Sequence, residues 1–200
     1  MNTAVNITID PENIASSRAQ LLDLICTRAY KSGDFTLSSG QKSTYYINGK
    51  QVTLDPFGAL YTGQVLLSLL PAGTGAVAGL TLGADPIVAA VSVVSALVGQ
   101  PVPALIVRKQ TKGHGTMAWI EGPTLPVGTK VAVLEDVVTT GKSAMLAVEK
   151  LRDAGFVVEN VITLVDRQQG GAEFYAAQGL AFTAVFTIAA VQSRAAELGL

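Results

Sequence analysis

One stretch decides the fold: Val131-Ala132-Val133-Leu134-Glu135-Asp136-Val137-Val138-Thr139-Thr140-Gly141-Lys142-Ser143-Ala144. Its first four residues are apolar and predict a buried strand of a parallel sheet. The small residues after the two acids leave backbone N–H groups free at a helix N-terminus, where a phosphate is held favourably. The acids would lie beside that phosphate and accept hydrogen bonds from ribose hydroxyls. The stretch therefore predicts a sugar-phosphate site.

An ordinary strand-to-helix turn is the alternative for this stretch, because Asp, Thr and Gly are common in turns and helix caps. Such a turn requires neither paired acids after a buried strand nor the Thr-Thr-Gly-x-Ser pattern of residues 139–143. The combination favours the binding site.

The composition favours one domain with a large core. The chain has 200 residues, of which 49% are apolar and only 14% are charged, and its mean hydropathy is +0.41. Part of this apolar surface is expected to lie between subunits. The longest apolar stretch, residues 86–98, is shorter than the roughly 20 residues that span a bilayer and is expected to form a core helix.

Charge and cysteine content exclude several other classes. The net charge of −1 gives no overall attraction to nucleic acid, and the single Cys26 excludes an internal disulfide and a multi-cysteine metal site. Residues 1–11 lack the basic and apolar regions of a signal peptide. We expect a cytoplasmic protein that binds neither nucleic acid nor membranes.

Helix and strand signals alternate along the chain, with a turn at residues 32–34. This alternation predicts an α/β fold with a central, mostly parallel sheet flanked by helices, and ligands collect at the carboxyl ends of such strands. We expect a single domain over residues 1–200, with residues 1–50 contributing a small hood over the site. Helices are expected over 17–31, 56–70, 86–98, 143–154, 172–178 and 189–198, and strands over 43–48, 76–80, 104–107, 130–134, 157–165 and 182–186.

A second cluster, Arg108-Lys109-Gln110-Thr111-Lys112-Gly113-His114-Gly115-Thr116, holds three of the fourteen Lys and Arg residues and the only His. We call residues 108–116 the basic loop. Cations in a Gly-containing loop after a buried strand are suited to closing over a diphosphate. A solvated basic surface loop is the alternative.

Four segments together resemble one family. Residues 131–144 are similar to the 5-phosphoribosyl 1-diphosphate (PRPP) signature of the type I phosphoribosyltransferases. Within that family, three further segments are similar to orotate phosphoribosyltransferase: the basic loop with Ile120-Glu121-Gly122, the Phe35–Asn48 segment and the Val165–Gly171 turn. They occur in the family's order. The Gly79–Pro86 segment also resembles the family's diphosphate loop, and a plain strand-to-helix turn is its alternative.

The resemblance implies transfer of a phosphoribosyl group from PRPP to orotate, with Lys112, His114 and Asp136 as catalytic residues. Arg167 is expected to bind the orotate carboxylate, because its planar guanidinium matches a carboxylate bidentately; an ordinary turn arginine is the alternative. Thr139, Tyr45 and Tyr46 complete the expected orotate site, although an alternating aromatic strand is as often core. The expected PRPP-binding residues are Arg108, Lys109, Lys112, His114, Glu135, Asp136, Val137, Val138, Thr139, Thr140, Gly141, Lys142 and Ser143.

The resemblance also implies that Mg2+ arrives on PRPP without a separate protein site, and that the basic loop closes over the neighbouring active site in a homodimer. Two lysines that some family members carry, at Ser38 and in the loop around Gly83, are absent here. A purine or other base phosphoribosyltransferase is the alternative enzyme. A PRPP-sensing regulator of the same fold is the alternative from another class, and it would need a basic stripe that this chain does not show.

Overall fold

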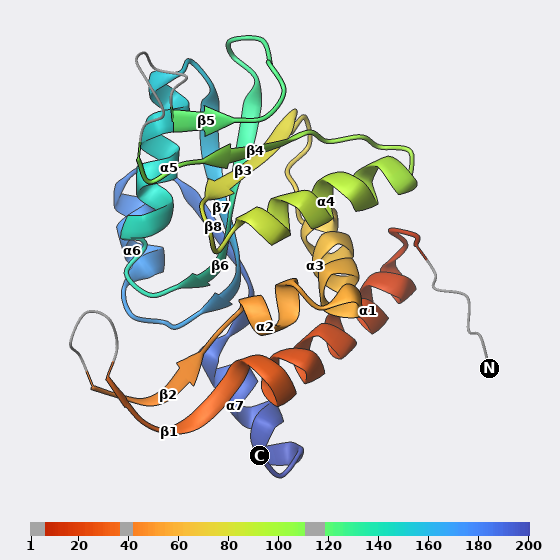
Figure 1. Ribbon diagram of the computed structural model, residues 1–200, viewed down its shortest axis with the longest axis vertical. Helices are drawn as coiled ribbons and strands as arrows, with labels where there is room; N and C mark the ends of the chain where they lie inside the picture. The colour runs from red at the N-terminus through yellow and green to blue at the C-terminus, as the bar shows by residue number, and fades with distance from the viewer. Residues whose placement is uncertain (1–6, 37–41, 111–118) are drawn as a thin grey trace.

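The computed structural model describes residues 7–36, 42–110 and 119–200 and contains a six-stranded sheet and a separate two-stranded sheet (Figure 1). The strands are β1 (Tyr30–Thr36), β2 (Lys42–Ile47), β3 (Ala76–Leu80), β4 (Ala104–Val107), β5 (Ile120–Glu121), β6 (Lys130–Val138), β7 (Val157–Asp166) and β8 (Ala181–Thr187). The helices are α1 (Pro11–Leu24), the π-helical turn η1 (Ile25–Ala29), α2 (Lys50–Thr53), α3 (Pro56–Ser68), α4 (Asp85–Leu97), α5 (Lys142–Asp153), α6 (Gly171–Ala177) and α7 (Ile188–Glu197).

The main sheet has the strand order β5-β4-β3-β6-β7-β8, and its inner pairs are parallel. Only β5, at one edge, runs antiparallel to its neighbour β4. The expected α/β fold with a central, mostly parallel sheet is confirmed. Most expected elements lie within one or two residues of their observed bounds, because their hydrophobic periodicity and flanking Pro and Gly residues are strong local signals.

Two predictions for the N-terminal part of the chain were wrong. The first helix begins at Pro11 rather than Ser17, because Asp10 caps it by accepting a hydrogen bond from the Asn13 amide (2.9 Å). Residues 32–34 do not form a turn but lie within β1, with an irregularity between Ser32 and Phe35 where β1 pairs with β2. Pairing with the following strand, β2, outweighs the local turn preference of Ser-Gly-Asp.

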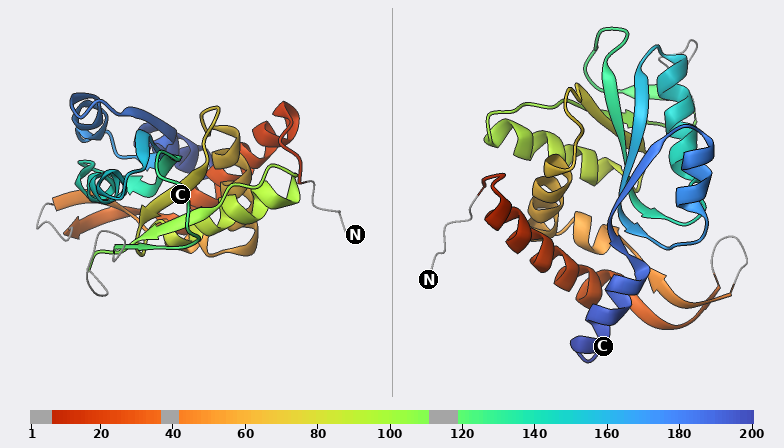
Figure 2. Two further views of the ribbon diagram at one scale, coloured as in Figure 1. Left: turned by 90° about the horizontal axis from the view of Figure 1, so that it is seen from above. Right: turned by 180° about the vertical axis from the view of Figure 1, so that it is seen from behind.

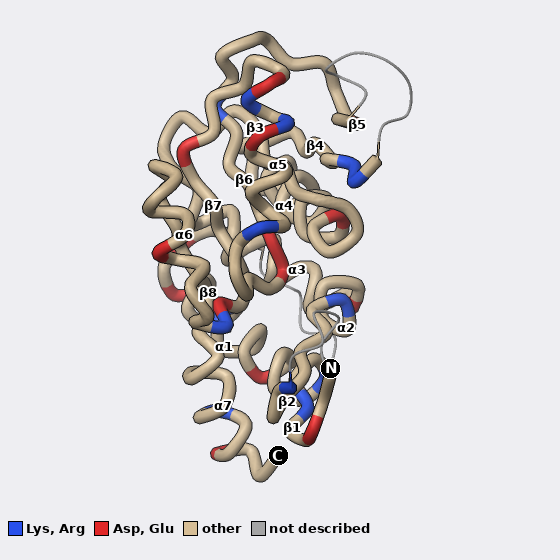
Figure 3. Tube along the Cα trace, turned by 90° about the vertical axis from the view of Figure 1, so that its left-hand side faces the viewer, with Lys and Arg blue, Asp and Glu red and all other residues tan. Residues whose placement is uncertain are grey.

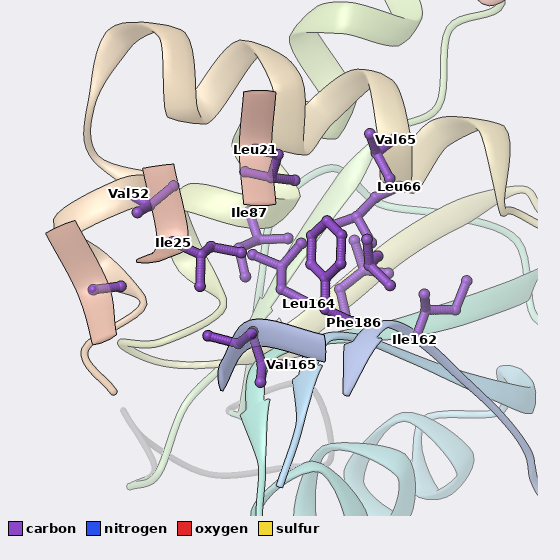
Figure 4. Close-up of a cluster of buried hydrophobic side chains, with 14 of the residues drawn as sticks. Leu21, Ile25, Val52, Val65, Leu66, Ile87, Ile162, Leu164, Val165 and Phe186 are labelled. Carbon is purple, nitrogen blue, oxygen red and sulfur yellow. The ribbon is translucent and has the colours of Figure 1, made fainter. Parts of the chain in front are cut away.

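Helices cover both faces of the main sheet (Figure 2). One face packs against α1, α3, α4 and α7, and the other packs against α5 and α6. The first of these clusters, shown in Figure 4, joins Leu21 and Ile25 of the N-terminal segment to Leu164 and Phe186 of the sheet. The small β1–β2 sheet is therefore connected through η1 and α2 to the same core that supports the main sheet.

The α4 helix is a core element on one face only. Ile87 and Val91 are fully buried, whereas Val93 and Leu97 are 61% and 60% exposed. Helix α3 carries no charged residue and α4 carries only Asp85 (Figure 3). The groove on their outer surface is apolar, because it is lined by Pro, Ala, Leu and Val side chains. Within the described ranges, no helix has the length and apolar character that crossing a membrane requires.

Candidate active site

The strand order reverses between β3 and β6. After β3 the chain crosses to β4 through α4 on one face, whereas after β6 it crosses to β7 through α5 on the opposite face. At such a reversal the two outgoing loops diverge, and ligands bind between them at the carboxyl ends of the strands. The loops are the β3–α4 loop (residues 81–84) and the segment at residues 139–143, which we call the phosphate loop.

The phosphate loop encloses a small polar cavity. Gly141 adopts a left-handed conformation (φ +84°), and the first bond of α5 runs from the Met145 amide to the Gly141 carbonyl (3.1 Å). The amides of residues 142–144 therefore have no partner within the helix. The cavity has a volume of about 80 Å³ and is lined by residues 137–144 together with Glu135 and Tyr175. Free amides at the positive end of a helix dipole make this cavity suitable for a phosphate group.

The Tyr175 side chain fixes the shape of this loop. Its hydroxyl donates a hydrogen bond to the Gly141 carbonyl (3.0 Å), and its ring is fully buried. A side chain at Gly141 would place a β-carbon 2.8 Å from Phe174 Cδ1 and 2.9 Å from Tyr175 Cζ. Only glycine satisfies both the positive φ and this close packing. Sequence reasoning did not single out Tyr175, because its contact with Gly141 joins residues far apart in the chain.

The two acids lie inside β6 rather than after it. The strand was expected to end at Leu134, but its pairing with β7 continues as far as Val138 and Asp166. Pairing with a long neighbouring strand extends β6 beyond the apolar run that the sequence marks. Successive residues of a strand point to opposite faces, so Glu135 and Asp136 point in different directions.

Glu135 lies in the wall of the phosphate-loop cavity and is 6% exposed. Burial raises the pKa of its carboxyl well above the ordinary value, and the negative charge of Asp136 raises it further. The positive charge of Lys109 acts in the opposite direction. A carboxyl that is neutral over a wider pH range repels an incoming phosphate less and can also donate a hydrogen bond.

Asp136 lies between two glycines from different parts of the chain. A β-carbon at Gly83 would be 2.8 Å from Asp136 Oδ1, and one at Gly49 would be 3.0 Å from Asp136 Cβ. The β3–α4 loop and the segment leading into α2 thus both approach this carboxylate closely. The requirement for glycine at residue 49 was not recognised in the sequence: Asn48-Gly49 marks a turn, but not the close approach of Asp136.

Arg167 follows β7 directly and points toward the small β1–β2 sheet. Its Nε donates to the Tyr45 hydroxyl (3.0 Å), its Nη2 donates to Ser43 Oγ (3.2 Å), and its guanidinium carbon lies 4.7 Å from the centre of the Tyr45 ring. The structure therefore brings Arg167 and Tyr45 together. It places Tyr46 on the other face of β2, where its ring packs against Phe35. Ser43 was not among the expected site residues, although its two-residue spacing from Tyr45 puts both on one face of the strand.

The described part of the basic loop lines a second, larger groove. This groove, of about 400 Å³, is bounded by Arg108 and Lys109 and by Thr81 of the β3–α4 loop. Arg108 forms an ion pair with Glu121 (2.9 Å), and its amide donates a hydrogen bond to the Trp119 carbonyl (2.8 Å), so the chain segments before and after residues 111–118 are joined. Lys112, His114 and the Ser38 position lie outside the described residues.

A parallel sheet with its phosphate loop and paired acids at the reversal of strand order defines the class as a type I phosphoribosyltransferase. A crystal structure of the Mycobacterium tuberculosis orotate phosphoribosyltransferase superimposes with a TM-score of 0.78 at 38% identity, covering 88% of this chain and 98% of that one. The same enzyme in complex with PRPP gives a TM-score of 0.72 at 35% identity over 88% of this chain and 99% of that one.

The orotate phosphoribosyltransferase of a Nostoc species is 69% identical over 187 residues, which cover 94% of this chain and 91% of that protein. No family model matches the chain. The chain belongs to the orotate phosphoribosyltransferase family, and the expectation drawn from its motifs is confirmed.

Proposed function

We propose that the protein transfers the 5-phosphoribosyl group of PRPP to a ring nitrogen of orotate, in the synthesis of the pyrimidine nucleotide UMP. The bond between ribose C1 and the diphosphate oxygen breaks, a bond from C1 to the orotate nitrogen forms, and the proton of that nitrogen is lost. The products are orotidine 5'-phosphate and diphosphate. One observation carries the proposal: the phosphate loop and the buried Arg167 follow the carboxyl ends of the neighbouring strands β6 and β7, where the Arg167 amide donates a hydrogen bond to the carbonyl of Val138, the last residue of β6 (2.9 Å).

The donor half of the site has a division of roles. The phosphate loop and the adjoining residues Val137 and Val138 hold the 5-phosphate, supported by the free amides and the lining of the small cavity. Glu135 and Asp136 hold the ribose hydroxyls. Fixing the donor at both ends brings ribose C1 to a defined position, and positioning of this kind supplies much of the rate enhancement in group transfer.

The departing diphosphate is the part of the reaction that needs positive charge. We assign Arg108, Lys109, Lys112 and His114 to it, because the larger groove brings Arg108 and Lys109 beside the β3–α4 loop. Lys112→Ala should lower kcat while leaving PRPP binding largely intact, measured by initial rates and by calorimetric titration. Full kcat in this variant would remove Lys112 from the catalytic role.

The acceptor half of the site centres on Arg167. Its guanidinium is suited to the orotate carboxylate, and Tyr45 and Thr139 complete the proposed pocket, whereas Tyr46 faces the opposite side of β2. Arg167→Ala should raise the KM for orotate far more than the KM for PRPP. Equal effects on both substrates would place Arg167 outside the acceptor pocket.

Mg2+ is proposed to enter with PRPP. Mg2+ usually keeps several waters and is held by substrate phosphates together with one or two carboxylates, and the carboxylate oxygens of Asp136 fit such an ion. Asp136 is the carboxylate that would lie beside the ion, and it faces Gly83 of the β3–α4 loop. The bound ion would neutralise charge on the diphosphate. Calorimetric titration of PRPP with and without Mg2+ tests this requirement apart from turnover.

A homodimer is proposed, with the basic loop of one subunit closing over the neighbouring active site. The apolar outer surface of α3 and α4 supports it, because Phe57, Val93 and Leu97 are exposed there. Val93→Glu should give a monomer in light scattering. Val127→Glu is the matched control, because Val127 is 81% exposed but precedes β6 elsewhere on the molecule.

Mixing two impaired variants tests the exchange of loops. In a mixed dimer of Lys112→Ala and Asp136→Asn subunits, one site would combine an intact loop from one subunit with an intact Asp136 from the other. Activity should then return on mixing. Two variants that stay inactive after their subunits have exchanged would show that each loop serves its own subunit.

The first experiment on the activity follows the loss of orotate absorbance with PRPP and Mg2+. Consumption that requires all three components supports the proposal, whereas turnover of adenine, hypoxanthine or uracil instead would keep the donor site and overturn the acceptor. A cytoplasmic location stays a prediction, which cell fractionation tests.

A further inference from the structure

The Arg167 guanidinium is a buried charge that neutral groups hold. The residue is 9% exposed, and none of the ion pairs found among the described residues includes it. Its hydrogen bonds go to the hydroxyl oxygens of Ser43 and Tyr45, while its face lies over the Tyr45 ring. A buried charge is costly unless it is paired, and these contacts orient the charge without neutralising it.

The two hydroxyls leave most of the guanidinium available. A guanidinium has five N–H groups, of which one on Nε and one on Nη2 are directed to Tyr45 and Ser43. Both N–H groups of Nη1 and one of Nη2 are not used by these bonds. These groups form the fork that a carboxylate accepts bidentately.

The hydroxyl of Ser43 is itself oriented. It donates its proton to the Tyr45 carbonyl (2.7 Å), so its oxygen presents a lone pair to Arg167. The Tyr45 ring is in turn held in a stacked arrangement with Tyr30, at a centroid distance of 6.1 Å. The β1–β2 sheet thus provides a rigid pair of acceptors for a side chain that belongs to the main sheet.

We infer that Ser43 and Tyr45 are positioning residues that lock the Arg167 guanidinium for the carboxylate of the acceptor. This inference rests on the proposed role of Arg167 in binding orotate. Arginine has many rotamers, and a bidentate contact requires one of them. Loss of either hydroxyl therefore weakens the acceptor site without touching the donor site on β6 and α5.

The test uses Tyr45→Phe and Ser43→Ala, each of which deletes one acceptor. The KM for orotate should rise about tenfold in each variant, as expected for a hydrogen bond to a charged group whose second anchor remains. The KM for PRPP and the melting temperature should stay near those of the unmodified protein. Thr44→Val is the matched control, because it removes a hydroxyl from the exposed face of the same strand and should change neither KM.

A double-mutant cycle separates positioning from general support of the fold. In an Arg167→Lys background, Tyr45→Phe should add little, because a lysine ammonium cannot use the locked fork. Additive effects, or parallel losses in PRPP affinity and melting temperature, would overturn the inference.

Arg167→Ala distinguishes failure of this inference from failure of the proposed function. A large rise in orotate KM for Arg167→Ala, with Tyr45→Phe and Ser43→Ala unchanged, overturns only the positioning role. An unchanged orotate KM for Arg167→Ala overturns the assignment of the acceptor pocket itself.

Discussion

Replacement of Gly141 by alanine should destabilise the protein through two separable effects. The left-handed conformation at φ +84° costs an L-residue about 1–2 kcal/mol. The new β-carbon would also lie 2.8 Å from Phe174 Cδ1 and 2.9 Å from Tyr175 Cζ, and overpacking of this kind costs about 1–3 kcal/mol. Together these give a loss of about 2–5 kcal/mol in the free energy of unfolding, a large share of the roughly 5–15 kcal/mol of a typical domain.

Gly170 offers a matched control for the backbone effect alone. It precedes α6 as Gly141 precedes α5, its φ is +90°, and a β-carbon there would meet no atom within 4 Å. Gly170→Ala should therefore lose only the backbone part. The difference between the two variants isolates the packing of Tyr175 and Phe174 against the phosphate loop.

Equilibrium urea unfolding measures both variants, with the fluorescence of the single Trp119 and circular dichroism as probes. The protein concentration is held fixed, because the midpoint of an oligomer depends on it. Calorimetric PRPP titration of Gly141→Ala should also show weaker binding. Equal losses of stability in the two variants would refute the argument that close packing at Gly141 shapes the loop.

Three further predictions concern ionisable groups. Glu135→Gln should become increasingly stabilising, relative to the unmodified protein, as the pH rises above about 4.5. The pKa of the Glu135 carboxyl is raised in the folded state, so ionisation of this carboxyl favours the unfolded state above that pH, whereas below it the carboxyl is protonated in both the folded and the unfolded state. A melting-temperature difference between the two proteins that stays constant from pH 4.5 to 8 would contradict this. Asp136→Asn keeps the shape between the two glycines but removes the charge, so PRPP affinity in calorimetry should fall about tenfold or more, and an unchanged affinity would remove Asp136 from the ribose site. Burial raises the pKa of the Cys26 thiol to about 11, so a disulfide reagent at pH 8 should react only as fast as the protein unfolds; rapid reaction of the native protein would show that this thiol is accessible.

Much of the fold was predictable from local pattern. The strand at residues 76–80 and the strand at 104–107 were expected with their observed bounds, because a short apolar run limited by Gly and Pro is a strong signal. The extension of β6 to Val138 and the strand character of residues 32–34 were not predictable, since both depend on pairing with a neighbouring strand rather than on the local residue pattern. The short β5 was not among the strands expected from local pattern, because two residues carry too little periodicity.

The residues of the donor site could likewise be predicted from one contiguous motif, because a phosphate loop is built from consecutive backbone amides. For the acceptor site, individual residues could be predicted, but the contacts between them could not. Arg167 was expected because a guanidinium suits a carboxylate. Its hydrogen bonds to Ser43 and Tyr45 span more than 120 positions of sequence, and neither segment has a local pattern that predicts contact with the other.

The sequence by itself determined the alternation of strands and helices, the phosphate loop and the family, because each of these depends on neighbouring residues or on motifs in order. The tertiary structure decided which side chains and loops from different segments come into contact. The strand order brought the β3–α4 loop beside Asp136 of β6, burial raised the pKa of Glu135, and the β1–β2 sheet contacts Arg167. These outcomes follow from the packing of distant segments, where solvent exclusion and close approach are properties of the whole fold rather than of any stretch of it.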